Sequence, residues 1–90
     1  MTDTQLNHPF PEMIDPANPF DPAAFEAEEV MAIHGGALMQ NRRVYQSPMF
    51  VAHYVGYHGT FELKDVWPIQ MADKALHLVV RAYNAEAATL

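Results

Sequence analysis

The clearest hydrophobic periodicity lies in the segment from Asp65 to about Glu86. Apolar residues recur there at helical spacing and cover roughly 200° of the wheel, wider than the stripe of a normal surface helix. Asp65 is placed to cap this helix, and Pro68 falls in the first turn, where proline loses no backbone partner. The pattern predicts a long C-terminal helix with more apolar surface than a single hairpin covers. One flank of that surface consists of Met71, Ala75, Leu78 and Ala82.

The segment from Arg43 to Lys64 is rich in β-branched and aromatic residues, which is typical of strands. Two glycines near its middle indicate a hairpin. A loop of three residues leaves Gly59 alone at positive φ, whereas a two-residue loop would place Tyr57 and His58 there. We therefore expect the longer loop. It predicts the cross-strand pairs Val55–Phe61, His53–Leu63 and Tyr54–Glu62.

A second helical pattern begins at Pro22. Asp21 can cap a helix whose first residue is this proline, and several acidic residues would lie near the positive end of its dipole. Apolar positions share one arc as far as His34, and Gly35-Gly36 supplies a left-handed stop. The pattern predicts a short first helix.

Proline dominates the beginning of the chain, because five of the seven prolines fall between Pro9 and Pro22. Each one fixes its own φ and keeps its predecessor out of the helical region. We therefore expect residues 1–21 to form an extended, acidic arm. Phe10 and Phe20 would anchor it, either on its own domain or on a partner. A disordered leader is the alternative for the first few residues.

Together these elements predict an α+β domain at residues 22–90, preceded by the arm: a short helix, an antiparallel β-hairpin that oligomerisation could extend into a larger sheet, and the long helix. A chain of 90 residues buries a modest core, and without cysteines no disulfide can reinforce it. Association with a second copy is the remaining way to bury more surface. We expect a homodimer or a subunit of a larger assembly. The predicted partner-binding residues are Phe10, Phe20, Met71, Ala75, Leu78 and Ala82.

Charge narrows the choice of partners. The net charge is −6, and residues 1–29 contain acidic side chains but no Lys or Arg. Such a segment repels phosphate, and the bases elsewhere are scattered, so nucleic acid is not an expected partner. The sequence shows neither a secretory signal pattern nor an apolar run of the roughly 20 residues that a membrane span needs. We therefore expect no membrane partner and a cytoplasmic location.

Candidate chemistry is sparse. In the hairpin register that we did not choose, His53 would oppose Glu62 near His58, which is the best metal or acid–base group that the chain offers. No third ligand has a diagnostic spacing, and neither a nucleophile elbow nor a glycine-rich phosphate loop occurs. We therefore expect no catalytic residue, no metal and no cofactor. On the long helix, Asp73, His77 and Arg81 can touch in sequence, but a solvated face explains them better.

One resemblance concerns the C-terminal part of the chain. Trp67, the step Met71-Ala72-Asp73 and the triplet Arg81-Ala82-Tyr83, preceded by a hairpin, resemble the C-terminal half of a small uncharacterised bacterial domain family. The resemblance implies the hairpin and the helix, and it carries no activity to this chain.

The sequence therefore favours a non-catalytic interaction or accessory protein. The alternative is a small enzyme or ligand-binding protein with a His/Asp/Arg site in a cleft between subunits. Its residues would be His53, His58 or His77, or the polar stripe from Asp73 to Arg81.

Overall fold

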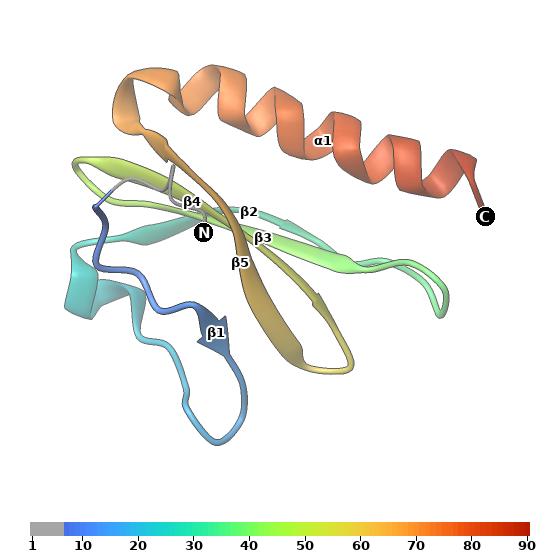
Figure 1. Ribbon diagram of the computed structural model, residues 1–90, viewed down its shortest axis with the longest axis horizontal. Coiled ribbons are helices and arrows are strands. Elements are labelled where there is room, and N and C mark those ends of the chain that lie inside the picture. Colours follow the sequence, from blue (N-terminus) through green and yellow to red (C-terminus); the bar gives the residue numbers. More distant parts are fainter. Residues whose placement is uncertain (1–6) are drawn as a thin grey trace.

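A computed structural model of the chain describes residues 7–90, so the first six residues of the predicted arm lie outside the described part. One antiparallel sheet has the strand order β1-β5-β4-β3-β2, and a long helix, α1, lies across one of its faces (Figure 1). The prediction of an α+β fold with a long C-terminal helix is confirmed. The elements are β1 (Met13–Ile14), η1 (Pro22–Phe25), β2 (Glu28–Ile33), β3 (Asn41–Gln46), β4 (Phe50–Tyr57), β5 (Thr60–Pro68), η2 (Ile69–Met71) and α1 (Ala72–Ala88).

Both faces of the sheet are covered. Side chains alternate between the faces along each strand, so a strand that is buried on both sides is apolar throughout. On the helix side the buried apolar cluster is Val44, Val51, Ala75 and Val79. On the opposite side it is Phe10, Tyr45, Ala52, Tyr54 and Phe61. Figure 1 shows the N-terminal segment crossing this second side, away from α1. Strand β4 is thus the centre of a three-layered molecule, which explains its lack of a polar face.

The predicted first helix is wrong. Asp21 does cap a helical turn at Pro22, since its side chain accepts a hydrogen bond from the Ala23 amide at 3.2 Å. The turn ends at Phe25, because Glu26 takes the left-handed conformation with φ 56°. The chain then forms β2, which pairs with β3. Pairing and burial against the sheet outweigh the moderate helix propensity of this segment.

The predicted hairpin register is also wrong. The turn between β4 and β5 has two residues, His58 and Gly59, and both have positive φ, at 59° and 85°. Histidine tolerates this conformation better than most residues, and a two-residue turn of this kind matches the twist of the strands. Val55 therefore faces Glu62 rather than Phe61. A bulge after His53 then shifts the pairing again.

The beginning of the long helix differs from the prediction as well. Asp65 caps nothing, because β5 continues through it to Pro68 and pairs there with β4. A single turn, η2, follows, and α1 begins at Ala72. The predicted end near Glu86 lies close to the observed end at Ala88. The predicted polar stripe is exposed along its whole length: Gln70, Asp73, Lys74, His77, Arg81 and Asn84.

Candidate functional site

A chain of polar side chains connects the sheet to the C-terminal end of α1. Nδ1 of His53 lies 3.1 Å from Oδ2 of Asp65, and Nε2 of His53 lies 3.3 Å from Nη1 of Arg42. Arg42 also donates through Nη2 to Oε1 of Glu86 at 3.1 Å. The other carboxylate oxygen of Glu86 accepts the backbone amide of Gln40 at 2.8 Å. Three consecutive strands and the loop before β3 are therefore joined to the C-terminal end of α1 at one place.

These two contacts indicate which ring nitrogen of His53 carries the proton. A guanidinium group only donates hydrogen bonds, so Nε2 must accept from Arg42 and carry no proton. Nδ1 then carries the proton and donates it to Asp65. The ring is 2% exposed and stacks on Trp67 with an interplanar angle of 13°. Because both nitrogens are engaged and the ring is covered, His53 works as a connector within the fold.

The pKa of Asp65 is shifted by its surroundings in this chain of contacts. The hydrogen bond from His53 lowers the pKa of the Asp65 carboxyl, and burial opposes this effect. The nearby charges of Lys64 and Arg42 lower the same pKa further. Asp65 is therefore ionised at neutral pH, as its hydrogen bond requires.

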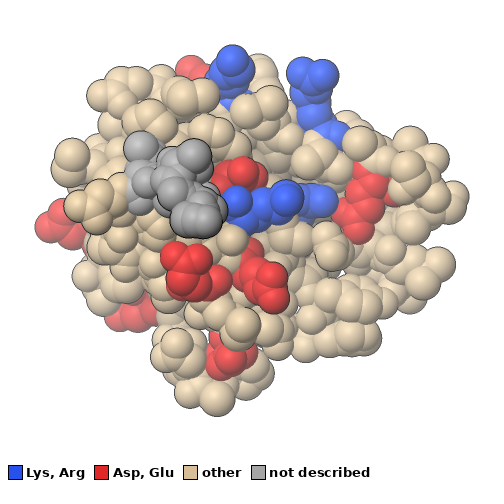
Figure 2. All heavy atoms as spheres, viewed as in Figure 1, with Lys and Arg blue, Asp and Glu red and all other residues tan. Residues whose placement is uncertain are grey.

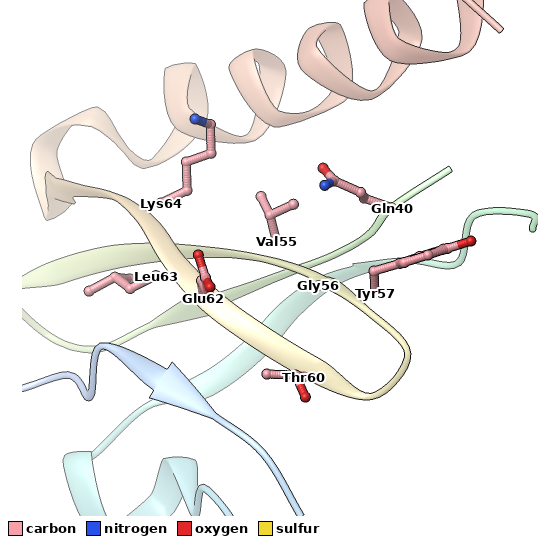
Figure 3. Close-up of a pocket in the computed structure, with 8 residues that line it drawn as sticks. All are labelled: Gln40, Val55, Gly56, Tyr57, Thr60, Glu62, Leu63 and Lys64. Atoms are coloured by element: carbon pink, nitrogen blue, oxygen red, sulfur yellow. The ribbon is translucent and has the colours of Figure 1, made fainter. Parts of the chain in front are cut away.

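A cavity of about 570 Å³ lies beside this polar chain, on the sheet face near the end of α1. Figure 3 shows part of its lining: Lys64 and Glu62 extend from β5 toward the helix side, Val55 lies on β4, and Gln40 lies just before β3. Neither Lys64 nor Glu62 has an ion-pair partner within residues 7–90. Among the described residues, the cavity therefore presents an unpaired cation and an unpaired anion beside Val55.

Exposed apolar residues gather near the same end of the sheet. Leu38, in the loop between β2 and β3, is 76% exposed, and Tyr57, at the end of β4, is 40% exposed. The Tyr57 hydroxyl donates to the carbonyl of Ala37, which holds the strand end against the loop. Leu90, 62% exposed, follows α1, whose C-terminal end lies on this side of the molecule (Figure 1). We call Leu38, Tyr57 and Leu90 the loop-end surface.

The predicted partner-binding residues fall in different places. Phe10 is 4% exposed and packs edge-on against Phe25, with ring centroids 5.7 Å apart. Phe20 packs edge-on against Tyr45 at 4.9 Å. Both anchors thus lie on their own sheet. On the long helix, Ala75 is fully buried against the sheet, and Met71, Leu78 and Ala82 are half-buried.

Two further contacts hold the N-terminal segment. The Tyr54 hydroxyl donates to the Pro11 carbonyl at 2.7 Å, and the Leu63 amide donates to the Glu12 carbonyl at 2.8 Å. Burial raises the pKa of both Tyr45 and Tyr54, so both phenols stay protonated under the aromatic cluster.

The other histidines named from the sequence are separate. His58 lies in the exposed turn and His77 on the exposed side of α1, so neither joins His53. Within residues 7–90 no three potential metal ligands come together. No motif or spacing points to Arg42 and Glu86, which lie far apart along the chain. One indirect signal exists for Arg42: side chains two residues apart on a strand share a face, so Arg42 lies on the same side of β3 as Val44.

Comparison with known proteins adds no relative. No family model matches the chain, and neither a curated protein nor a solved structure matches it. The resemblance of the segment after Trp67 to a small bacterial domain family stays a prediction. Within the described residues, no helix combines the length and apolar character that crossing a membrane would need.

Proposed function

We propose that this protein is a non-catalytic interaction protein that associates with a second copy of itself through the loop-end surface. The observation that carries the proposal is the exposure of Leu38 and Tyr57 beside a cavity, on a chain whose two sheet faces are otherwise covered. Leu38 is 76% exposed, so association can still bury most of its side chain. Full burial of a leucine side chain contributes about 1.5 to 3 kcal/mol of favourable free energy.

The size of the molecule agrees with this proposal. The accessible surface of the chain is 5626 Å². An interface of standard size covers about 800 Å² of each partner, which would be about one seventh of this surface. In the proposed dimer the loop-end surface forms the centre of such a contact.

The state of His53 supports a non-catalytic function. A general base needs a free nitrogen within reach of its substrate. Both nitrogens of His53 are occupied within the chain, by Asp65 and Arg42. The alternative of an enzyme that uses this histidine would require the polar chain to open first.

The charge distribution favours the same end of the molecule for contact between copies. In Figure 2 the lower half of this face, over β1, shows acidic groups and no basic ones. Two copies that met through this acidic half would repel each other. The loop-end surface consists of uncharged side chains, so a symmetric contact there avoids that repulsion.

The proposal is tested by sedimentation velocity and light scattering on the wild type and on Leu38→Asp. Wild type should form a species larger than the 10.1 kDa chain at micromolar concentration. Leu38→Asp should raise the dissociation constant about ten- to a hundredfold, because it removes the apolar gain and adds a charge. Met49→Asp is the control: Met49 is 66% exposed in the turn between β3 and β4, at the opposite end of the sheet. A monomeric wild type, or equal effects of both substitutions, would refute the proposal.

A further inference from the structure

The cavity beside α1 is lined by one basic and one acidic side chain, Lys64 and Glu62. Its lining therefore discriminates between ligands by their charge as well as by their size. We propose that it binds a small zwitterion: a free amino acid or a similar molecule with an ammonium group and a carboxylate. This inference concerns a ligand site, and it holds whether or not two copies associate.

The positions of two charges that are unpaired within residues 7–90 carry the inference. Lys64 and Glu62 extend from the same strand toward the helix side, and both line the cavity (Figure 3). Neither forms an ion pair within residues 7–90, although both lie within one cavity of about 570 Å³. A ligand carboxylate can bind the Lys64 ammonium while the ligand ammonium binds the Glu62 carboxylate, and each bond is then charge-assisted.

The charges around the cavity argue against a simple anion or cation. Besides Lys64 and Glu62, the neighbouring polar chain contributes one further base, Arg42, and two further acids, Asp65 and Glu86. The local sum is slightly negative, so a plain anion gains little from its surroundings. A plain cation meets the ammonium of Lys64 directly. A molecule that is neutral overall but carries both charges avoids both penalties.

The remaining lining fits the rest of such a ligand. Val55 offers an apolar surface on which an aliphatic side chain can lie, and Gln40, just before β3, also lines the cavity (Figure 3). Small-molecule sites have volumes of about 300 to 1,000 Å³. The cavity is within this range, with room for an amino acid or a dipeptide. Arg42 and Asp65 are bound to His53, so they set the local charge without competing for the ligand.

The test is a titration of the full chain, labelled with nitrogen-15, with L-leucine up to about 20 mM, because a ligand of this size is expected to bind in the millimolar range. Backbone amide shifts should concentrate at Gln40, Val55 and residues 62–64. Lys64→Gln and Glu62→Gln should each weaken binding about five- to tenfold, since each removes one charge-assisted contact at a partly exposed site. Lys74→Gln, on the exposed side of α1, is the matched control and should bind as the wild type does.

Two analogues separate the proposed class from its alternatives. 4-Methylpentanoate lacks the ammonium group and 3-methylbutylamine lacks the carboxylate, so each should bind at least fivefold more weakly than leucine. Equal binding of either analogue would overturn the zwitterion assignment. An absence of shifts with leucine, or shifts that survive both Lys64→Gln and Glu62→Gln, would overturn the site. The titration is read at a protein concentration where the chain has a single mass, so its result does not depend on the association proposed above.

Discussion

Phe10 offers the sharpest test of how the fold is held together, because it joins the N-terminal segment to the sheet. Its ring is 4% exposed and meets Phe20 and Phe25 with centroid distances of 6.4 and 5.7 Å. Phe10→Ala removes this ring from the middle of the aromatic cluster. Substitutions of this kind in a core cost about 3 to 5 kcal/mol, from the lost transfer energy and the cavity left behind.

That cost is large for a domain of this size. Native proteins have about 0.05 to 0.15 kcal/mol of stability per residue, which gives roughly 5 to 13 kcal/mol for 90 residues. Phe10→Ala should therefore remove between a quarter and nearly all of the free energy of unfolding. Urea denaturation followed by the fluorescence of Trp67 measures it, because this ring packs on the helix side and reports the sheet as a whole.

Met13→Ala is the control from the same segment. Met13 is 43% exposed on β1, so its truncation should change the free energy of unfolding by no more than about 0.5 kcal/mol. A loss below about 1 kcal/mol for Phe10→Ala would refute the reasoning, since the N-terminal segment would then lie on the sheet without stabilising it. A large loss of unfolding free energy for Phe10→Ala would mean that the N-terminal segment stabilises the sheet. Removing residues 7–21 would then expose the aromatic cluster and unfold the domain.

Three further predictions follow from single contacts. Glu86→Ala leaves the buried Arg42 without its carboxylate and should cost about 3 kcal/mol, with faster amide exchange in the last turns of α1. Gly56→Ala should cost about 1 to 3 kcal/mol of stability, measured by thermal unfolding, because a Cβ there would lie 2.5 Å from an aromatic carbon and a backbone oxygen of β5. Gly36→Ala is the control and should be nearly neutral, since the space around Gly36 is open. Asp65 has a lowered pKa, so its contribution is complete above the usual carboxyl pKa and is lost as the pH falls through the lowered value. Acid titration of stability should therefore show a constant difference between wild type and Asp65→Asn above about pH 4, and this difference should shrink as the pH falls further.

The long helix could be predicted because its pattern is local. From Ala72 onward, apolar residues recur with the helical period and the polar stripe is unbroken, so no distant contact is needed to recognise it. Its beginning could not be predicted in the same way. Asp65 and Pro68 suit a helix start, but β4 offers β5 a partner as far as Pro68, and the strand continues.

Strand β2 shows why the first half was misread. A regular half-buried strand has apolar residues at every second position. The pairing of β2 with β3 shifts between Glu29 and Met31, so Val30 and Met31 both pack on the helix-side cluster. This bulge breaks the alternation, and Ala27, Val30 and Met31 then fit a helical arc equally well. The sequence carries no local signal that separates the two interpretations.

The candidate site was only partly predictable. His53 was expected in the hairpin opposite Leu63, whereas the structure pairs it with Asp65. Asp65 became available to it only through the bulge after His53, which no spacing rule anticipates. Arg42 and Glu86 come from a strand and a helix whose relative placement depends on the whole fold. Side-chain contacts between separate elements depend on how those elements pack, so a sequence pattern alone does not predict them.

The same contacts bear on how the loop-end surface could bind a partner. The loop that carries Leu38 is fixed at both ends and in the middle: the Gly35 amide donates to Asn41 Oδ1 at 2.7 Å, the Gln40 amide donates to Glu86 at 2.8 Å, and Tyr57 holds the loop through a backbone carbonyl. A loop ordered before association loses little conformational entropy when it binds, so more of the apolar gain at Leu38 remains as affinity. The buried polar chain that ends at Glu86 would then assist binding without touching the partner, by keeping the loop in the shape that binding requires.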